Sequence, residues 1–176
     1  MESYWRHSLA CGVVARTLAI SRRFSRPEQF FVAGLLHDIG RLVLYIRSSS
    51  QTAQVFSKYG EGGKLLIDVE REVLGFDHTQ IGEELTRSWN FPPHLVNAIR
   101  FHHHPMETNA FQIEASMIHL ADFVVHLIEM GTSGEHWIPP LNMGAWKRLD
   151  FTTSMLEKLI EESEYQLTDV LKIFLH

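Results

Sequence analysis

The chain of 176 residues has one cysteine, Cys11, so no disulfide can form within it. This scarcity fits a reducing, cytoplasmic setting. The sequence also lacks an uninterrupted apolar run that approaches the roughly 18 residues of a membrane helix. The first residues, Met1–Ser8, have no signal-peptide pattern. These absences argue against a disulfide-stapled scaffold and against a membrane-inserted protein.

An excess of positive charge is lacking as well. The formal net charge is -5 and the pI is near 6.1, whereas general nucleic-acid binding usually needs a basic face. A small phosphorylated ligand held by a few local cations stays compatible with this charge. Hydrophobic residues make up 45% of the chain, enough for a sizeable core, so we expect a single domain over residues 1–176. The candidate internal boundary, Gly131–Pro140, is short for a domain linker.

No stretch shows the two-residue alternation of a half-buried strand, so the sequence predicts an all-α fold. Asp77 with Gln80 resembles a capping box, and Ser50 is a candidate cap for the helix that follows it. The first helix begins so abruptly that we expect a fragment that lacks an upstream helical segment. Helical periodicity predicts helices over 3–21, 27–46, 51–59, 64–74, 78–89, 93–103, 109–130, 153–163 and 167–175, with a short helical turn within 142–149.

Histidine, in contrast, is abundant, with 11 copies. His37 and Asp38 lie side by side within the apolar stretch Phe31–Leu44, where unpaired burial would be costly, so we hypothesise a metal centre. Each such residue alone has an ordinary explanation: a core histidine is usually satisfied by a hydrogen bond, and Asp122 could cap a helix or pair with an arginine. These explanations are much weaker for the whole set. Five further residues of metal-ligand type fall on apolar helical stripes: His7, His78, His102, His103 and Asp122.

Imidazole and carboxylate together suit a divalent first-row metal, and this set could serve two ions. Iron, manganese, zinc and nickel all accept such ligands, so the sequence does not identify the metal. The order of these residues resembles the ligand order of the HD superfamily of metal-dependent phosphohydrolases. The closer resemblance is to the HDOD family, the HD-related output domains of bacterial signalling proteins. It covers roughly residues 4–130 and is carried by Trp5–Ala10, Ala33–Leu42, Gly75–His78 with Ile81–Gly82, Trp89–Pro92 and Ala98–His103.

The resemblance implies an HD-domain-like helical bundle with the metal site between helices. It also implies two divalent transition-metal ions with Asp38 bridging them, and a helical segment upstream of Trp5. The Gly-Tyr-Pro element of the related cyclic di-GMP phosphodiesterases is replaced by His104–Glu107, which argues against that substrate. Ser3 stands where some of those enzymes have a glutamate, which argues against a third metal. The implied ligands are His7, His37, Asp38, His78, His102, His103 and Asp122.

Three functions follow from these observations. The first is a bacterial signal-transduction domain that hydrolyses a phosphoester, such as a nucleotide, with Asp38 and Arg41 as catalytic residues; Arg41 replaces a frequent lysine and would contact the phosphate. The second is a non-catalytic output module with a structural or vestigial metal site and a helical surface for a signalling partner. The third, less favoured, is a di-iron oxygenase. The histidines expected to surround the ligands or lie on the surface are His104, His119 and His126.

Overall fold

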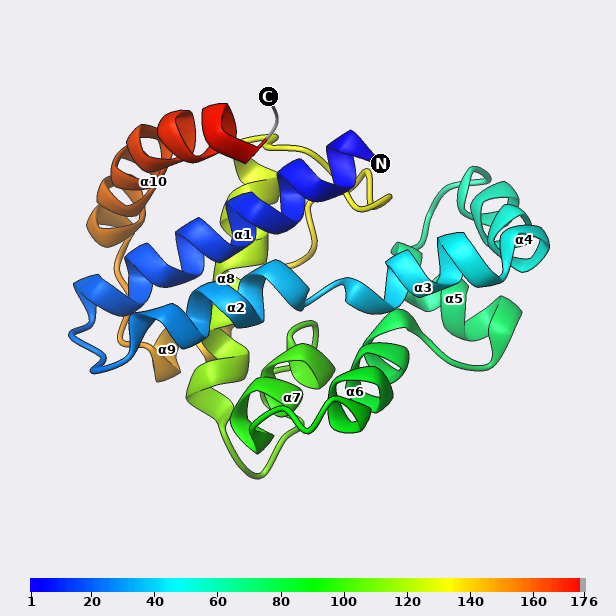
Figure 1. Cartoon of the computed structure of the whole chain (residues 1–176), viewed down its shortest axis with the longest axis horizontal. Coiled ribbons are helices and arrows are strands. Elements are labelled where there is room, and N and C mark those ends of the chain that lie inside the picture. The colour runs from blue at the N-terminus through cyan, green and yellow to red at the C-terminus, as the bar shows by residue number, and fades with distance from the viewer. Residues whose placement is uncertain (175–176) are drawn as a thin grey trace.

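The fold is all-α, as the sequence predicts. Figure 1 shows a computed structural model, which describes residues 1–174, and within them there are ten helices and no strand. The helices are α1 (Glu2–Ser21), α2 (Pro27–Leu36), α3 (Ile39–Arg47), α4 (Ser49–Tyr59), α5 (Leu66–Leu74), α6 (His78–Ser88), α7 (Pro93–Phe101), α8 (Gln112–Leu127), α9 (Met143–Arg148) and α10 (Thr153–Phe174).

The main hydrophobic core lies between α1, α2, α7, α8 and α10, and apolar residues of all five helices contribute to it. Helix α8 crosses behind α1 and α2, and α10 covers the far side of α1 (Figure 1). A second, smaller cluster joins α4 to α5 through Val55, Tyr59, Leu66 and Val69. The junction between α2 and α3 lies between these two parts (Figure 1), and His37 and Asp38 lie at this junction.

Two glycines allow the helices around this junction to approach closely. A Cβ atom at Gly34 would lie only 2.6 Å from the Cys11 carbonyl oxygen, so α2 packs directly on the backbone of α1. A Cβ at Gly40 would lie 1.9 Å from the His78 carbonyl oxygen, which brings the start of α3 against the start of α6. Any larger residue would separate these helices, and with them the side chains that they position.

The continuous helix predicted over 27–46 is wrong. The chain leaves helical geometry at Asp38, where φ is -100° and ψ is 14°, and α2 and α3 are separate helices. Local propensity favours helix throughout this apolar stretch, so the break has a tertiary cause. Asp38 is held by Arg41 and by histidines from other helices, contacts that a continuous helix would not orient in the same way.

Several predicted boundaries also change. Ser48, not Ser50, precedes α4 as its N-cap. Helix α8 is shorter than predicted, because Phe111 before it adopts a left-handed backbone with φ of 57°. The capping box of Asp77 and Gln80 is confirmed. Helix α5 begins at 66 rather than 64, α6 ends at 88 rather than 89, and α7 ends at 101 rather than 103. The two predicted C-terminal helices form one helix, α10, and the predicted end at Leu175 lies outside the described residues.

One stretch, Pro27–Arg47, is long and apolar enough by composition to cross a membrane, with a mean hydropathy of 1.3. Half of it is buried inside the protein. It is interrupted at His37 and Asp38, and Arg41 within it is also buried. These features are those of a core segment of the helical bundle, so its hydropathy is weak evidence for a membrane span.

Candidate metal centre

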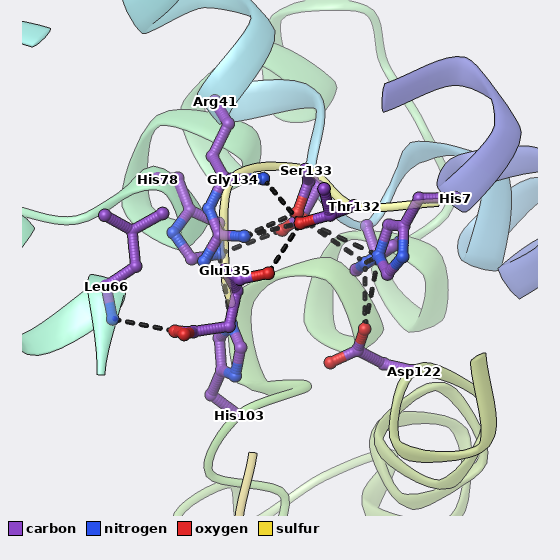
Figure 2. A network of polar contacts seen from close by, with 12 residues as sticks. His7, Arg41, Leu66, His78, His103, Asp122, Thr132, Ser133, Gly134 and Glu135 are labelled. Carbon is purple, nitrogen blue, oxygen red and sulfur yellow. Dashed lines mark hydrogen bonds and ion pairs between the residues drawn. The ribbon is translucent and has the colours of Figure 1, made fainter. Parts of the chain in front are cut away.

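The seven predicted ligand residues converge from five parts of the fold. They come from α1, the α2–α3 junction, the start of α6, the end of α7 and the inner face of α8, and their ligand atoms gather in two groups. Figure 2 shows four of these side chains, those of His7, His78, His103 and Asp122. Six of the seven residues are at most 3% exposed, whereas His103 is half-buried. Such dense burial of polar groups requires that they satisfy one another or share a bound cation.

Asp38 divides the cluster into two halves, each facing one of its carboxylate oxygens. We call His7, His37 and Asp122 the first half, and His78, His102 and His103 the second half. In the first half, Asp38 Oδ2 lies 3.4 Å from His37 Nε2 and 3.9 Å from His7 Nε2, and Asp122 Oδ1 lies 3.3 Å from His7 Nε2. In the second half, Asp38 Oδ1 lies 3.0 Å from His78 Nε2 and 3.7 Å from His102 Nε2.

Hydrogen bonds on the outer side of the rings fix which nitrogen faces inward. His37 and His102 each follow a helix end, and each donates from Nδ1 to the carbonyl oxygen three residues before it, at 2.7 and 2.8 Å. His78 donates from Nδ1 to Glu70 Oε2 at 2.6 Å. Because Nδ1 donates outward, Nε2 of these three rings faces the interior of the cluster, the orientation that a metal ligand needs.

Several inward-facing atoms are poorly satisfied by the protein itself. Asp38 Oδ1, Asp122 Oδ1 and His102 Nε2 have no aligned hydrogen bond to any described residue, although all are buried. His7 Nε2 faces His37 Nε2 at 3.3 Å, and His103 Nε2 faces His78 Nε2 at 3.2 Å. Two imidazole lone pairs at this distance repel unless a proton or a cation lies between them. The residues therefore fit a cation in each half.

The charges of the cluster favour the binding of a cation. Burial raises the pKa of Asp38, but Arg41, His37 and His78 outweigh this and hold it well below its usual range. Asp122 has a lowered pKa because His126 and the nearby histidines outweigh its burial. Burial lowers the pKa of His102 to about 3, so this ring is a neutral donor at physiological pH. Asp38, Asp122 and His102 thus offer two carboxylates and a neutral imidazole, the donors that a divalent transition metal takes.

The pKa values of His37 and His78 are raised instead. Burial lowers the pKa of His37, but the nearby Cys11, Asp38 and Asp122 outweigh it. Burial and Arg41 lower the pKa of His78, but Glu70 and Asp38 outweigh them. These two rings therefore bind a second proton more readily than an unperturbed histidine when no cation is bound. A metal ion must displace that proton, which makes metal binding dependent on pH.

Arg41 supports Asp38, and Glu70 supports His78, from outside the cluster. Arg41 is 2% exposed and donates from Nη1 to Asp38 Oδ2 at 3.1 Å and to Ser133 Oγ at 2.6 Å, and from Nε to Glu70 Oε1 at 3.3 Å. Glu70 also accepts from the backbone N–H of His78 at 2.9 Å. The predicted phosphate-contacting Arg41 is thus first of all a partner of Asp38.

Glu70 was absent from the predicted site. It lies on α5 beside the buried Leu66, Ile67 and Val69 and is only 2% exposed. A carboxylate on an apolar helical stripe is the pattern that predicts Asp122 as a ligand, and the same pattern is present at Glu70. Ser133 had no such signal, because its place beside Arg41 depends on the path of a loop.

The loop Gly131–Pro140 passes over the cluster as a strap (Figure 2). Tyr45 donates its hydroxyl to the Ser133 carbonyl oxygen, and Tyr59 donates its hydroxyl to Glu135. Glu135 Oε2 also accepts from the backbone N–H of Leu66 at 2.7 Å. The stretch that looked like a candidate domain boundary therefore fastens α8 to α3, α4 and α5 across the site.

One side of the cluster stays accessible. A cavity of about 250 Å³ reaches His103, and His119, Pro140 and Asn142 line it beside that ring. His119 lies between this cavity and the second half: it donates from Nδ1 to the His102 carbonyl oxygen at 2.8 Å and accepts from the Asn142 N–H at 2.9 Å. A larger cavity of about 610 Å³ between α6 and α7 contacts none of the seven predicted ligands.

Two other histidines fall where the sequence predicts. His126 donates from Nδ1 to the Asp122 carbonyl oxygen at 3.0 Å, and its ring packs edge-on against His7 at 4.9 Å between ring centres. His104 lies nearer the surface, with 40% of its side chain exposed. Neither belongs to the two groups of ligand atoms.

Comparison with known proteins identifies relatives of this fold. The family described as HDOD domain matches residues 1–105. Among solved structures, an HDOD domain protein with unknown function from Geobacter sulfurreducens is 22% identical, with a TM-score of 0.84 over 99% of this chain. A candidate phosphohydrolase from Shewanella amazonensis SB2B is 26% identical, with a TM-score of 0.73 over 92% of this chain. The MmoQ response regulator from Methylococcus capsulatus str. Bath is 24% identical, with a TM-score of 0.66 over 90%.

These relatives are longer than the present chain. It covers 63%, 58% and 60% of the three solved structures, respectively. An uncharacterized protein of Treponema pallidum (strain Nichols) is 25% identical over 109 residues, which are 60% of this chain and 21% of the relative. The likeness therefore shows a shared fold and leaves open what else each longer protein does.

Proposed function

The chain belongs to the HDOD domain family, and from this premise we propose that it is a bacterial, cytoplasmic signalling domain that binds two divalent metal ions and hydrolyses a phosphoester. The observation that carries this proposal is the position of Asp38 between two sets of inward-facing imidazoles. Of the solved structures that the chain resembles, one is a candidate phosphohydrolase and another a response regulator, which supports phosphoester hydrolysis and signalling, respectively.

The two halves of the cluster would each hold one ion. His7, His37 and Asp122 would hold the first ion, Asp38 would contribute one oxygen to each, and the second half would be completed by its three histidines. When bound, such a pair of ions supplies an activated nucleophile near neutral pH and stabilises charge on the transferring phosphoryl group. Iron, manganese, zinc and nickel remain the candidates.

The residues around the ions would position the metal ligands and the substrate and would exclude water. Arg41 holds Asp38 Oδ2, and its own buried Nη2 has no hydrogen-bond partner in the described part of the chain, so this nitrogen is the donor that a phosphate oxygen bound within the cluster would meet. Glu70 fixes the ring of His78. The strap, whose Ser133 accepts from Arg41, would exclude water from the side of the cluster that it covers. The substrate would approach from the cavity at His103, whose volume of about 250 Å³ suits a small phosphorylated molecule.

Turnover of generic phosphoesters tests the proposal. Protein loaded with manganese, iron, zinc or nickel should hydrolyse p-nitrophenyl phosphate or bis(p-nitrophenyl) phosphate, and a panel of cyclic nucleotides would extend the search. Asp38→Asn should abolish turnover, whereas Asp169→Asn, at an exposed carboxylate of α10, should leave it unchanged. Equal loss in both variants, or turnover that survives Asp38→Asn, would contradict the catalytic role of the cluster.

A second candidate is a non-catalytic output module whose metal ions are structural. It is favoured by the enclosure of the site, since every predicted ligand except His103 is at most 3% exposed. In that case the metal-loaded protein should be more stable than the metal-free protein but should turn over none of these substrates. It should also retain a signalling partner whose binding survives mutation of Arg41, a residue that catalysis would need.

A further inference from the structure

Cys11, the lone cysteine, lies against the first half of the cluster. It is one helical turn after His7 on α1, so both side chains leave the helix on the same face. It is fully buried, and its sulfur lies within 4.8 Å of ligand atoms of His7, His37 and Asp122, all of which lie within that distance of one another.

The contact between α1 and α2 creates this arrangement. Gly34 allows the two backbones to touch at Cys11, and His37 follows at the end of α2, one helical turn later. Because His37 Nδ1 is committed to the Gly34 carbonyl oxygen, its Nε2 faces the space shared with Cys11 and Asp122. The buried Oδ1 of Asp122 accepts no aligned hydrogen bond from a described residue, although His7 Nε2 and His126 Nδ1 lie 3.3 and 3.1 Å away, and this is an independent sign that a cation belongs in this space.

We infer that Cys11 Sγ is a fifth protein ligand of the ion held by the first half, beside His7, His37, Asp122 and the shared Asp38, an inference that rests on the proposed metal centre. The ligand set of this half is then two imidazoles, one sulfur and Asp122, with Asp38 shared between the halves. Zinc–sulfur and zinc–nitrogen bonds are about 2.3 and 2.0 Å long, so the four atoms would need to contract toward the ion by only about 1 Å. The thiol proton leaves to solvent as the sulfur–metal bond forms.

Charge supports this assignment. Two divalent ions carry more positive charge than Asp38 and Asp122 neutralise, and the negative charge of Glu70 is already offset by Arg41. A thiolate at Cys11 removes one further unit of uncompensated buried charge, which is otherwise costly. A thiolate ligand also makes the two halves chemically different. The first half would prefer zinc, cobalt or ferrous iron, whereas the all-nitrogen and oxygen second half would accept manganese more readily.

Cobalt(II) is the probe that tests this inference, because a thiolate ligand gives it a near-ultraviolet charge-transfer band that nitrogen and oxygen ligands do not. The metal-free chain is titrated with cobalt(II), and bound metal is counted in parallel. We expect the band in the natural chain and its loss in Cys11→Ser. The affinity of the first half should fall on the order of 10–100-fold, the effect that even an outer partner of a metal ligand has.

Ala15→Ser is the matched control, because it introduces the same hydroxyl at a fully buried position of α1 one turn farther on. It should keep the band. If Cys11→Ser does not fold, X-ray absorption on the zinc-loaded natural chain decides instead, with a sulfur neighbour expected at about 2.3 Å.

Two outcomes separate the inference from the metal centre itself. Cobalt bound without the band, together with zinc that has only nitrogen and oxygen neighbours, would overturn the role of Cys11 and leave the centre intact. No cobalt or zinc uptake at all would overturn the centre and the inference with it.

Discussion

Replacing Glu70 by glutamine tests whether the second half is built to hold a metal. Glu70 accepts from His78 Nδ1 at 2.6 Å and from Arg41 Nε at 3.3 Å, and it is 2% exposed. Glutamine keeps the shape but removes the charge that orients the imidazole and raises its basicity. Loss of such a partner costs about 10–100-fold in metal affinity. This corresponds to about 1.4–2.7 kcal/mol of binding free energy.

The same change should affect the metal-free fold. Hydrogen bonds to charged groups contribute about 1.5–3 kcal/mol each. Because glutamine can still accept from Arg41, we expect Glu70→Gln to lower the free energy of unfolding by about 2 kcal/mol, near the lower end of that range. Denaturant unfolding of the metal-free protein measures this loss. Competition with a metal-binding dye measures affinity separately, so the two effects are not confused.

Glu72→Gln provides the control on the same helix. Glu72 pairs with Lys58 and Lys64 at the surface, where its side chain is 39% exposed, and such exposed pairs contribute little to stability. It should leave metal affinity unchanged. If Glu70→Gln binds metal as tightly as the natural chain, or if both variants lose affinity equally, the reasoning that Glu70 orients a metal-binding histidine is refuted.

Three further results are expected. Gly34→Ala should lower the free energy of unfolding by about 1–3 kcal/mol, because its Cβ would lie 2.6 Å from the Cys11 carbonyl oxygen; an unchanged denaturant midpoint would contradict the close packing of α1 on α2. Metal affinity should rise with pH through the neutral range, because the pKa values of His37 and His78 are raised and the ion competes with protons for these rings. Competition with a metal-binding dye at several pH values measures this, and an affinity that does not change with pH would contradict it. Asp77→Ala should lower the free energy of unfolding by about 1–2 kcal/mol through loss of the capping box, and thermal unfolding that matches the natural chain would argue against that cap.

Helical periodicity was sufficient to predict the all-α fold and to select the polar residues that meet in the interior. His7, His78 and Asp122 stand out because each interrupts an apolar stripe, a pattern visible without any three-dimensional information. The structure brings them together, while their role as metal ligands stays a prediction. A single domain over the whole chain, and an upstream segment, likewise remain predictions.

The break between α2 and α3 could not be predicted from local sequence. Residues around His37 favour a continuous helix, and the turn forms because Asp38 meets Arg41 and His78 from elsewhere in the fold. The strap shows the same limitation. Ser133 reaches Arg41 across 92 residues of sequence, and its loop composition alone indicates only a connection.

The central claim is that Asp38 lies between two metal ions. A crystal structure of the protein loaded with zinc or manganese, with anomalous scattering measured at the metal edge, tests it most directly. The account predicts two anomalous peaks, one on each side of the Asp38 carboxylate, each about 2.0–2.2 Å from the ligand nitrogens and oxygens of its half. Peaks absent from the cluster, or metal bound only at sites that do not include Asp38, would contradict it.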